Sequence, residues 1–213
     1  DLLSRMVVEA EDARREMGDY LALHTLILHD AKRLVVRLND KAGCLVMDDE
    51  MKRLILGVGN FTPPRFSLAS ANEALETGRL SLIKSPEIRD GVRDMADQMT
   101  FVDRQWQRYI RIKQDAEQAA YGAAGLSLTS EEGLQLSPGV AKVSGMDQYR
   151  IITPEGICGN TQIIALASNA AITQHLYTIY IGQVSAKLDT YAASLATYAG
   201  DERDGRGRSG ASE

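Results

Sequence analysis

A three-four alternation of apolar residues over positions 3–38 constrains this chain more than any other feature. It continues for about five heptads, which is typical of a long helix that packs along a seam against other helices. Its members are Leu3, Met6, Ala10, Ala13, Met17, Tyr20, His24, Ile27, Ala31, Leu34 and Leu38. The opposite face is charged. The run NDKAG, residues 39–43, should end the helix, with Gly43 after its C-terminus.

The same spacing predicts two more long helices. In one, Ser85 is the N-cap, Pro86 the first helical residue and Glu87 an acidic residue that complements the helix dipole. We expect this helix to run to about Tyr121, and the last helix to run from Asn160 or Thr161 to Gly200. Each long helix comes to about 38 residues, or roughly 57 Å. Helices of matching length are expected to lie side by side.

Shorter elements fill the connections between the long helices. We expect short helices from Asp48 to Leu56 and from an N-cap at Ser67 to a stop at Gly78. The run RLSLI that follows should place Leu80, Leu82 and Ile83 in the core. Residues 124–157 are rich in Gly, Ser, Thr and Pro, and VAKVSGMDQYRIIT within them reads as a weak hairpin.

These patterns predict an all-α fold, with three long and two short helices and an irregular loop or small hairpin at 124–157. We expect a single helical-bundle domain over residues 1–199. The polar run after Gly200 predicts a disordered tail at 200–213.

Composition excludes several classes of protein. The formal net charge is −5, so the basic footprint of a nucleic-acid-binding protein is absent. In the run DRQWQRYIRIK, residues 103–113, Trp106 and Tyr109 belong to the seam, whereas Arg104, Arg108 and Arg111 share another flank. We therefore interpret the arginines as a solvated, salt-bridged helix face rather than a nucleic-acid-binding stripe. No apolar run is long enough to span a bilayer. Asp1 already lies inside a helical pattern, so we expect that helix to continue upstream.

Catalytic and metal-binding signatures are missing from the sequence. It holds no Walker A, HExxH or GxSxG motif. His24, His29 and His175 do not have metal-ligand spacing. The sequence therefore predicts a protein that is not an enzyme and has no metal or cofactor. An alternative is an active site in the 124–157 insertion, for which Asp147, Tyr149 and Arg150 are the first residues to mutate.

Two sets of residues leave alternatives open. Tyr177, Tyr180 and Tyr191 on the last helix either pack against the other helices or line a ligand groove or an interface. Cys44 and Cys158 match no metal or redox spacing. They are either two buried free thiols or a disulfide that closes a loop of more than a hundred residues.

One stretch, ALETGRLSLIKSPEIRDGVRDM, carries a family resemblance. It resembles bacterial membrane-anchored proteins of unknown function that have one N-terminal transmembrane helix and an extracytoplasmic helical domain. The resemblance covers residues 9 to about 115, and the 124–157 insertion with Cys158 departs from it. The matching residues are Leu75, Gly78, Leu80, Leu82, Ile83 and Arg89.

The resemblance implies a domain on the periplasmic face of the inner membrane, anchored by a segment upstream of Asp1. An oxidising compartment favours the disulfide over free thiols. The predicted bundle also allows Cys44 and Cys158 to lie at the same end of their helices, within bonding reach.

Two functions follow as hypotheses. The first is a non-enzymatic, membrane-tethered module that binds a protein partner, forms a homo-oligomer or serves as a subunit of a membrane complex. The second is a periplasmic sensor domain that binds a small molecule between its helices.

Overall fold

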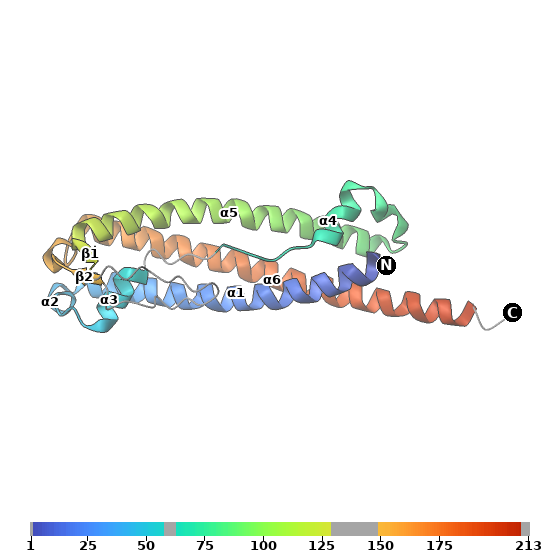
Figure 1. The fold of residues 1–213 in the computed structure, drawn as a ribbon, viewed down its shortest axis with the longest axis horizontal. Coiled ribbons are helices and arrows are strands. Elements are labelled where there is room, and N and C mark those ends of the chain that lie inside the picture. Colours follow the sequence, from blue (N-terminus) through green and yellow to red (C-terminus); the bar gives the residue numbers. More distant parts are fainter. Residues whose placement is uncertain (1, 58–62, 129–148, 210–213) are drawn as a thin grey trace. The chain divides into compact units, whose positions relative to one another are not determined.

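A computed structural model describes residues 2–57, 63–128 and 149–209 of the chain (Figure 1). Three long helices dominate it: α1 (Leu2–Asn39), α5 (Pro86–Ala124) and α6 (Thr161–Ser209). Three shorter helices are α2 (Lys41–Leu45), α3 (Asp49–Leu56) and α4 (Ala69–Glu76), and 3₁₀ helices cover Arg79–Leu82 and Pro154–Gly156. The predicted all-α fold is confirmed.

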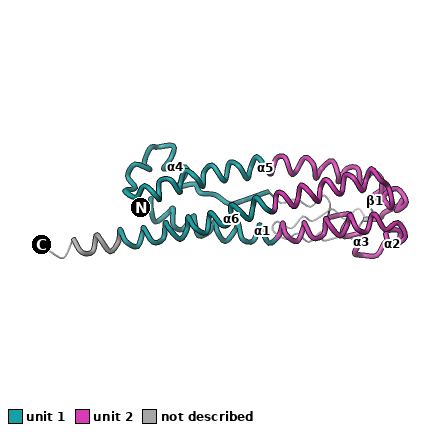
Figure 2. Tube along the Cα trace, turned by 180° about the vertical axis from the view of Figure 1, so that it is seen from behind, with its two compact units in different colours: residues 1–22, 63–105, 179–213 teal, residues 23–62, 106–178 magenta. Residues whose placement is uncertain are grey.

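The chain divides into two compact units, and each long helix contributes to both (Figure 2). Unit 1 comprises residues 1–22, 63–105 and 179–213. Unit 2 comprises residues 23–62 and 106–178. The short helix α4 belongs to unit 1, whereas α2, α3 and the strands belong to unit 2.

The seam predicted for the first helix is the buried face of α1. Nine of its eleven members are buried, and Leu3 and Ala31 are half-buried. Apolar residues at three-four spacing in α5 and α6 follow the same rule, since Val92, Met95, Val184 and Leu188 are almost fully enclosed. The three-four spacing therefore identified the inner faces of all three helices.

The start of α5 confirms the predicted helix signals. Ser85 Oγ accepts a hydrogen bond from the backbone N–H of Ile88 at 3.2 Å, and Pro86 is the first helical residue. Ser85 Oγ also donates to Glu87 at 2.7 Å, and this hydrogen bond is the largest cause of the lowered pKa of Glu87. The helix runs to Ala124, beyond the predicted Tyr121.

The predicted N-cap of α4 at Ser67 is wrong, because the N-cap residue is Leu68. Leu68 is buried and makes no side-chain capping bond. Glu9 of α1 caps the helix instead: its carboxylate accepts from the backbone N–H and from the hydroxyl of Ser70, both at 2.7 Å. A carboxylate from a neighbouring helix can satisfy an N-terminal N–H group as well as a local cap does.

Two further sequence predictions need correction. Leu82 is 75% exposed rather than in the core, because the 3₁₀ turn at Arg79–Leu82 directs only Leu80 inward before Ile83. The last helix does not end at Gly200 but continues to Ser209. A glycine costs a helix only about 1 kcal/mol relative to alanine and does not by itself stop it.

The predicted strand in the 124–157 insertion exists, but its partner differs from the prediction. Strand β2 (Tyr149–Ile151) pairs antiparallel with β1 (Leu126–Leu128), which directly follows α5. The first half of the predicted hairpin, residues 140–148, lies outside the described residues. Gly125 has φ +58°, the left-handed conformation that lets the chain leave α5 and enter β1.

Candidate functional site

A disulfide closes one end of unit 2. Cys44, in α2, and Cys158, just before α6, have Cα atoms 5.6 Å apart and are bonded. The backbone N–H of Gly159 donates to the carbonyl of Leu38 at 3.1 Å, which joins the end of α1 to the start of α6. The predicted cysteine pairing is therefore confirmed in the structure.

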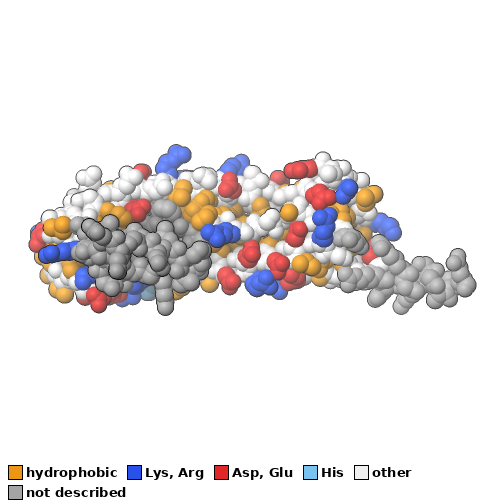
Figure 3. Space-filling model, viewed as in Figure 1, with side chains coloured by type: hydrophobic (Ala, Val, Ile, Leu, Met, Phe, Trp, Pro, Cys, Tyr) orange, Lys and Arg blue, Asp and Glu red, His pale blue; other side chains and the backbone are white. Residues whose placement is uncertain are grey.

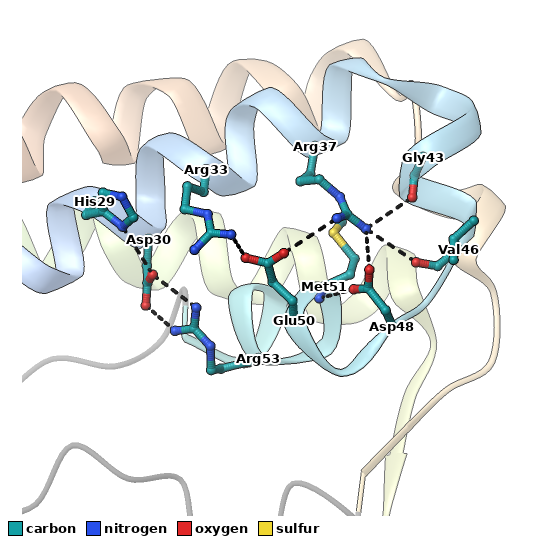
Figure 4. Close-up of polar contacts among 10 residues, drawn as sticks. All are labelled: His29, Asp30, Arg33, Arg37, Gly43, Val46, Asp48, Glu50, Met51 and Arg53. Atoms are coloured by element: carbon teal, nitrogen blue, oxygen red, sulfur yellow. Dashed lines mark hydrogen bonds and ion pairs between the residues drawn. The ribbon is translucent and has the colours of Figure 1, made fainter.

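A row of ion pairs fixes α3 against α1 in the same unit (Figure 4). Arg37 lies 3.0 Å from Asp48, and its guanidinium also donates to the carbonyls of Gly43 and Val46, at 3.2 and 3.4 Å. Asp48 accepts from the backbone N–H of Met51 at 2.7 Å as the N-cap of α3. This bond, followed by that to Arg37, lowers the Asp48 pKa.

The remaining members of this row pair in the same way. Arg33 and Arg37 both contact Glu50, and Arg53 forms a two-pronged pair with Asp30. Each acid is thus matched by an arginine, so these carboxylates hold the helix pair together rather than forming a metal site. No group of three His, Cys, Asp or Glu side chains suited to a metal ion occurs within the described residues.

A polar cluster lies in the core of unit 2 around Gln174, which is fully buried. Tyr109 donates from its hydroxyl to Gln174 Oε1. The amide nitrogen of Gln174 lies 3.0 Å from His24 Nδ1, 3.1 Å from the His24 carbonyl and 3.2 Å from Thr178 Oγ1. Each long helix therefore contributes a polar group to one buried network.

Aromatic rings enclose this network. Tyr109 and Tyr177 stack with ring centroids 4.8 Å apart, and the His24 ring meets the Tyr177 ring edge-on at 5.1 Å. Trp106 lies against both tyrosines. Burial, with a smaller effect of Tyr177, raises the pKa of Tyr109 far above its ordinary value. The Tyr109 hydroxyl therefore stays protonated and supplies no reactive oxygen. Its hydrogen bond to Gln174 helps to fix the helices in register.

A small cavity of about 50 Å³ lies beside this cluster. Lys113, only 2% exposed, lines it together with Asp30 and apolar residues of α1, α3 and α6. Burial lowers the pKa of the Lys113 ammonium to about 8, while the charge of Glu117 acts in the opposite direction. The sequence patterns did not single out this lysine, although Lys113 follows Trp106 and Tyr109 at the seam spacing.

The three predicted tyrosines fall in both compact units. Tyr177 belongs to the buried cluster of unit 2. In unit 1, Tyr180 packs edge-on against Phe101 at 5.3 Å, and Tyr191 is buried with no hydrogen-bond partner for its hydroxyl among the described residues. All three pack within their own unit, and a role in ligand binding or at an interface stays a prediction.

The structure describes only two of the three insertion residues proposed for catalysis. Asp147 lies outside the described residues. Tyr149 and Arg150 begin β2, where Arg150 is exposed and pairs in register with Ser127. Their role also stays a prediction.

The outward-facing side of α6 is a surface feature that the sequence patterns above did not predict. In unit 2 this side carries Ala165, Asn169, Ile172 and Leu176, all exposed, and we call these four residues the α6 outer face. Ile172 is 60% exposed and Leu176 is 44% exposed. They lie four residues apart, so they share one side of the helix. Ile179, the next large apolar residue exposed on α6, belongs to unit 1.

A sequence signal for this face was available. Residues 161–186 contain no Asp, Glu, Lys or Arg, whereas 25% of the whole chain is charged. On the face of the molecule that Figure 3 shows, acidic and basic side chains are interspersed among the other residues. A surface helix normally carries charge on its solvent side, so the missing charge marks this segment as unusual.

Comparison with protein-family models, with curated proteins and with solved structures found no match to this chain. The resemblance to a membrane-anchored family is therefore untested by these comparisons. Within the part of the chain that the structure describes, no helix is long and apolar enough to cross a membrane.

Proposed function

We propose that this chain is a non-enzymatic helical module that associates with another protein through the α6 outer face. The observation that carries the proposal is the exposed, uncharged side of a helix whose other side is already buried in its own unit. Interface cores are depleted in charged residues. A helix that is apolar on both sides is normally covered on both.

The α6 outer face suits a helical partner. Ile172 and Leu176 repeat at the spacing by which one helix inserts side chains into a groove or against another helix. The partner is either a second copy of this chain or a subunit of a membrane complex, which offers a complementary apolar helix face.

We further propose that the module works outside the cytoplasm and is tethered to a membrane by a segment upstream of Asp1. The Cys44–Cys158 disulfide supports the compartment, because such bonds persist in oxidising environments. The tether rests on the family resemblance alone.

Association is tested with a double variant, Ile172→Glu with Leu176→Lys. Both positions are exposed, so the variant should fold. The control is Val36→Glu on α1, which alters another exposed apolar residue of unit 2, 68% exposed. We expect the wild type and the control to self-associate in sedimentation experiments, or to retain one stoichiometric partner from solubilised membranes.

The double variant should bind at least about thirtyfold more weakly, since each lost side chain removes roughly 1 kcal/mol of apolar burial. A wild type that stays monomeric and recovers no stoichiometric partner would contradict the proposal. Equal losses in the control and the double variant would also contradict it.

A further inference from the structure

The cavity beside Lys113 has the composition of a small ligand site. Its volume of about 50 Å³ exceeds what a single water needs, which is roughly 10–15 Å³ measured in the same way. Apolar side chains from three helices form most of its wall, among them Ile27 of α1, Leu54 of α3 and Ala170 of α6. All of its lining residues belong to unit 2.

Lys113 brings a positive charge to this cavity. Among the described residues, no hydrogen bond and no ion pair within 4.0 Å reaches its ammonium group, and the centroid of the Tyr109 ring lies 5.9 Å from Nζ. A buried ammonium without an acceptor is costly, because three N–H donors have lost water. Such a group has a strong preference for an anion that can occupy the space next to it.

The charged groups near Lys113 do not remove its preference for an anion. Asp30 also lines the cavity, but both of its carboxylate oxygens are engaged by Arg53. Glu117, one turn from Lys113 on α5, is only partly buried, and burial raises its pKa. The charged groups near the Lys113 amine are therefore the Asp30–Arg53 ion pair and Glu117, which lies on the same helix as Lys113.

We propose that this cavity binds a short-chain monocarboxylate, with the carboxylate on Lys113 Nζ and the alkyl group against Ile27, Leu54 and Ala170. A single negative charge matches a single ammonium, and the apolar wall leaves room for an alkyl group. This site is separate from the α6 outer face, so the failure of either proposal leaves the other standing.

Binding should depend on the protonation of Lys113. The carboxylate pairs with the ammonium form, so affinity falls as pH rises above about 8. The groups that face Lys113 are Asp30 of α1, paired to Arg53 of α3, and Glu117 and Tyr109 of its own helix. A ligand of four to six heavy atoms should bind with a dissociation constant of roughly 0.1–10 mM.

The test is a calorimetric titration of the whole chain with sodium acetate, propionate and butyrate at pH 7, with sodium chloride at equal ionic strength as reference. We expect saturable binding of at least one carboxylate and none of chloride. Lys113→Met keeps the buried stem and should weaken binding at least about twentyfold. Lys32→Met removes the same charge from an exposed position of α1 and should leave binding unchanged.

A second variant keeps the test decisive if Lys113→Met does not fold. Ala170→Val narrows the cavity without removing the charge, so it should shift preference toward the shorter acids. Several outcomes overturn the proposal. These are no saturable carboxylate effect beyond chloride, equal affinity in Lys113→Met, or an unchanged chain-length preference in Ala170→Val.

Discussion

Replacing Gln174 by methionine tests the buried polar cluster of unit 2. Methionine has nearly the same shape, so the change removes hydrogen bonds and leaves almost no cavity. It would remove the acceptor of the Tyr109 hydroxyl and the contact of the amide with His24 Nδ1, whereas the His24 carbonyl keeps Thr178 Oγ1 as a donor. A buried polar group left without a partner costs about 1–3 kcal/mol. We therefore expect Gln174→Met to lower the free energy of unfolding by about 3 kcal/mol.

A double-mutant cycle separates the hydrogen bond from packing. Tyr109→Phe alone should cost about 1–2 kcal/mol, because it leaves Gln174 Oε1 without its donor. The double variant should cost about 1–2 kcal/mol less than the sum of the two single changes, since neither polar group is then stranded.

The assay is urea unfolding followed by circular dichroism. With a slope of about 3 kcal/mol/M, Gln174→Met should lower the midpoint by about 1 M. Gln118→Met, at an exposed position of α5 in the same unit, is the matched control and should move the midpoint little. If Gln174→Met costs less than about 0.5 kcal/mol, or if the two changes simply add, the cluster does not stabilise the unit as argued.

Three other predictions concern unit 2. Replacing Cys44 and Cys158 by serine should cost about 4–5 kcal/mol, because the bond closes a loop with a sequence separation of 114; urea unfolding of oxidised protein and variant measures this. As pH rises from 8 to 10.5, the free energy of unfolding of the wild type should increase by up to about 3 kcal/mol relative to that of Lys113→Met, because the unfolded chain keeps a proton that folded Lys113 releases. Urea unfolding of both proteins over this pH range measures the difference, and a difference that does not change with pH would refute the prediction. Arg37→Met should cost about 1–2 kcal/mol and Arg33→Met less than 1 in thermal unfolding, since only Arg37 also satisfies backbone carbonyls; equal costs would contradict the argument.

The inner faces of the helices were predictable because helix periodicity and burial are tied directly together. Met17 and Leu188 could be assigned to the core from spacing alone, and both are fully buried. The cap at Ser85 was predictable for a similar reason, since its partners are local in sequence. The cysteine pairing needed both the helix ends and an assumption about the compartment.

Features made by distant residues were not predictable in this way. The α4 N-terminus is capped by Glu9, which lies 61 residues from Ser70, and no local pattern announces such a partner. Gln174 and Lys113 are both buried, but the sequence does not reveal which groups contact a polar side chain in the core. The α6 outer face was different, because the missing charge in residues 161–186 is visible in the sequence itself.

Site-specific photo-crosslinking in intact cells measures the proposed association most directly. A photoreactive residue at position 172 samples the α6 outer face, and one at position 36 samples an equally exposed apolar position of the same unit. We expect a discrete cross-linked species at 172, whose mass identifies a second copy of this chain or a distinct subunit, and none at 36. No discrete species at 172, or the same species from both positions, would show that the α6 outer face does not bind a protein.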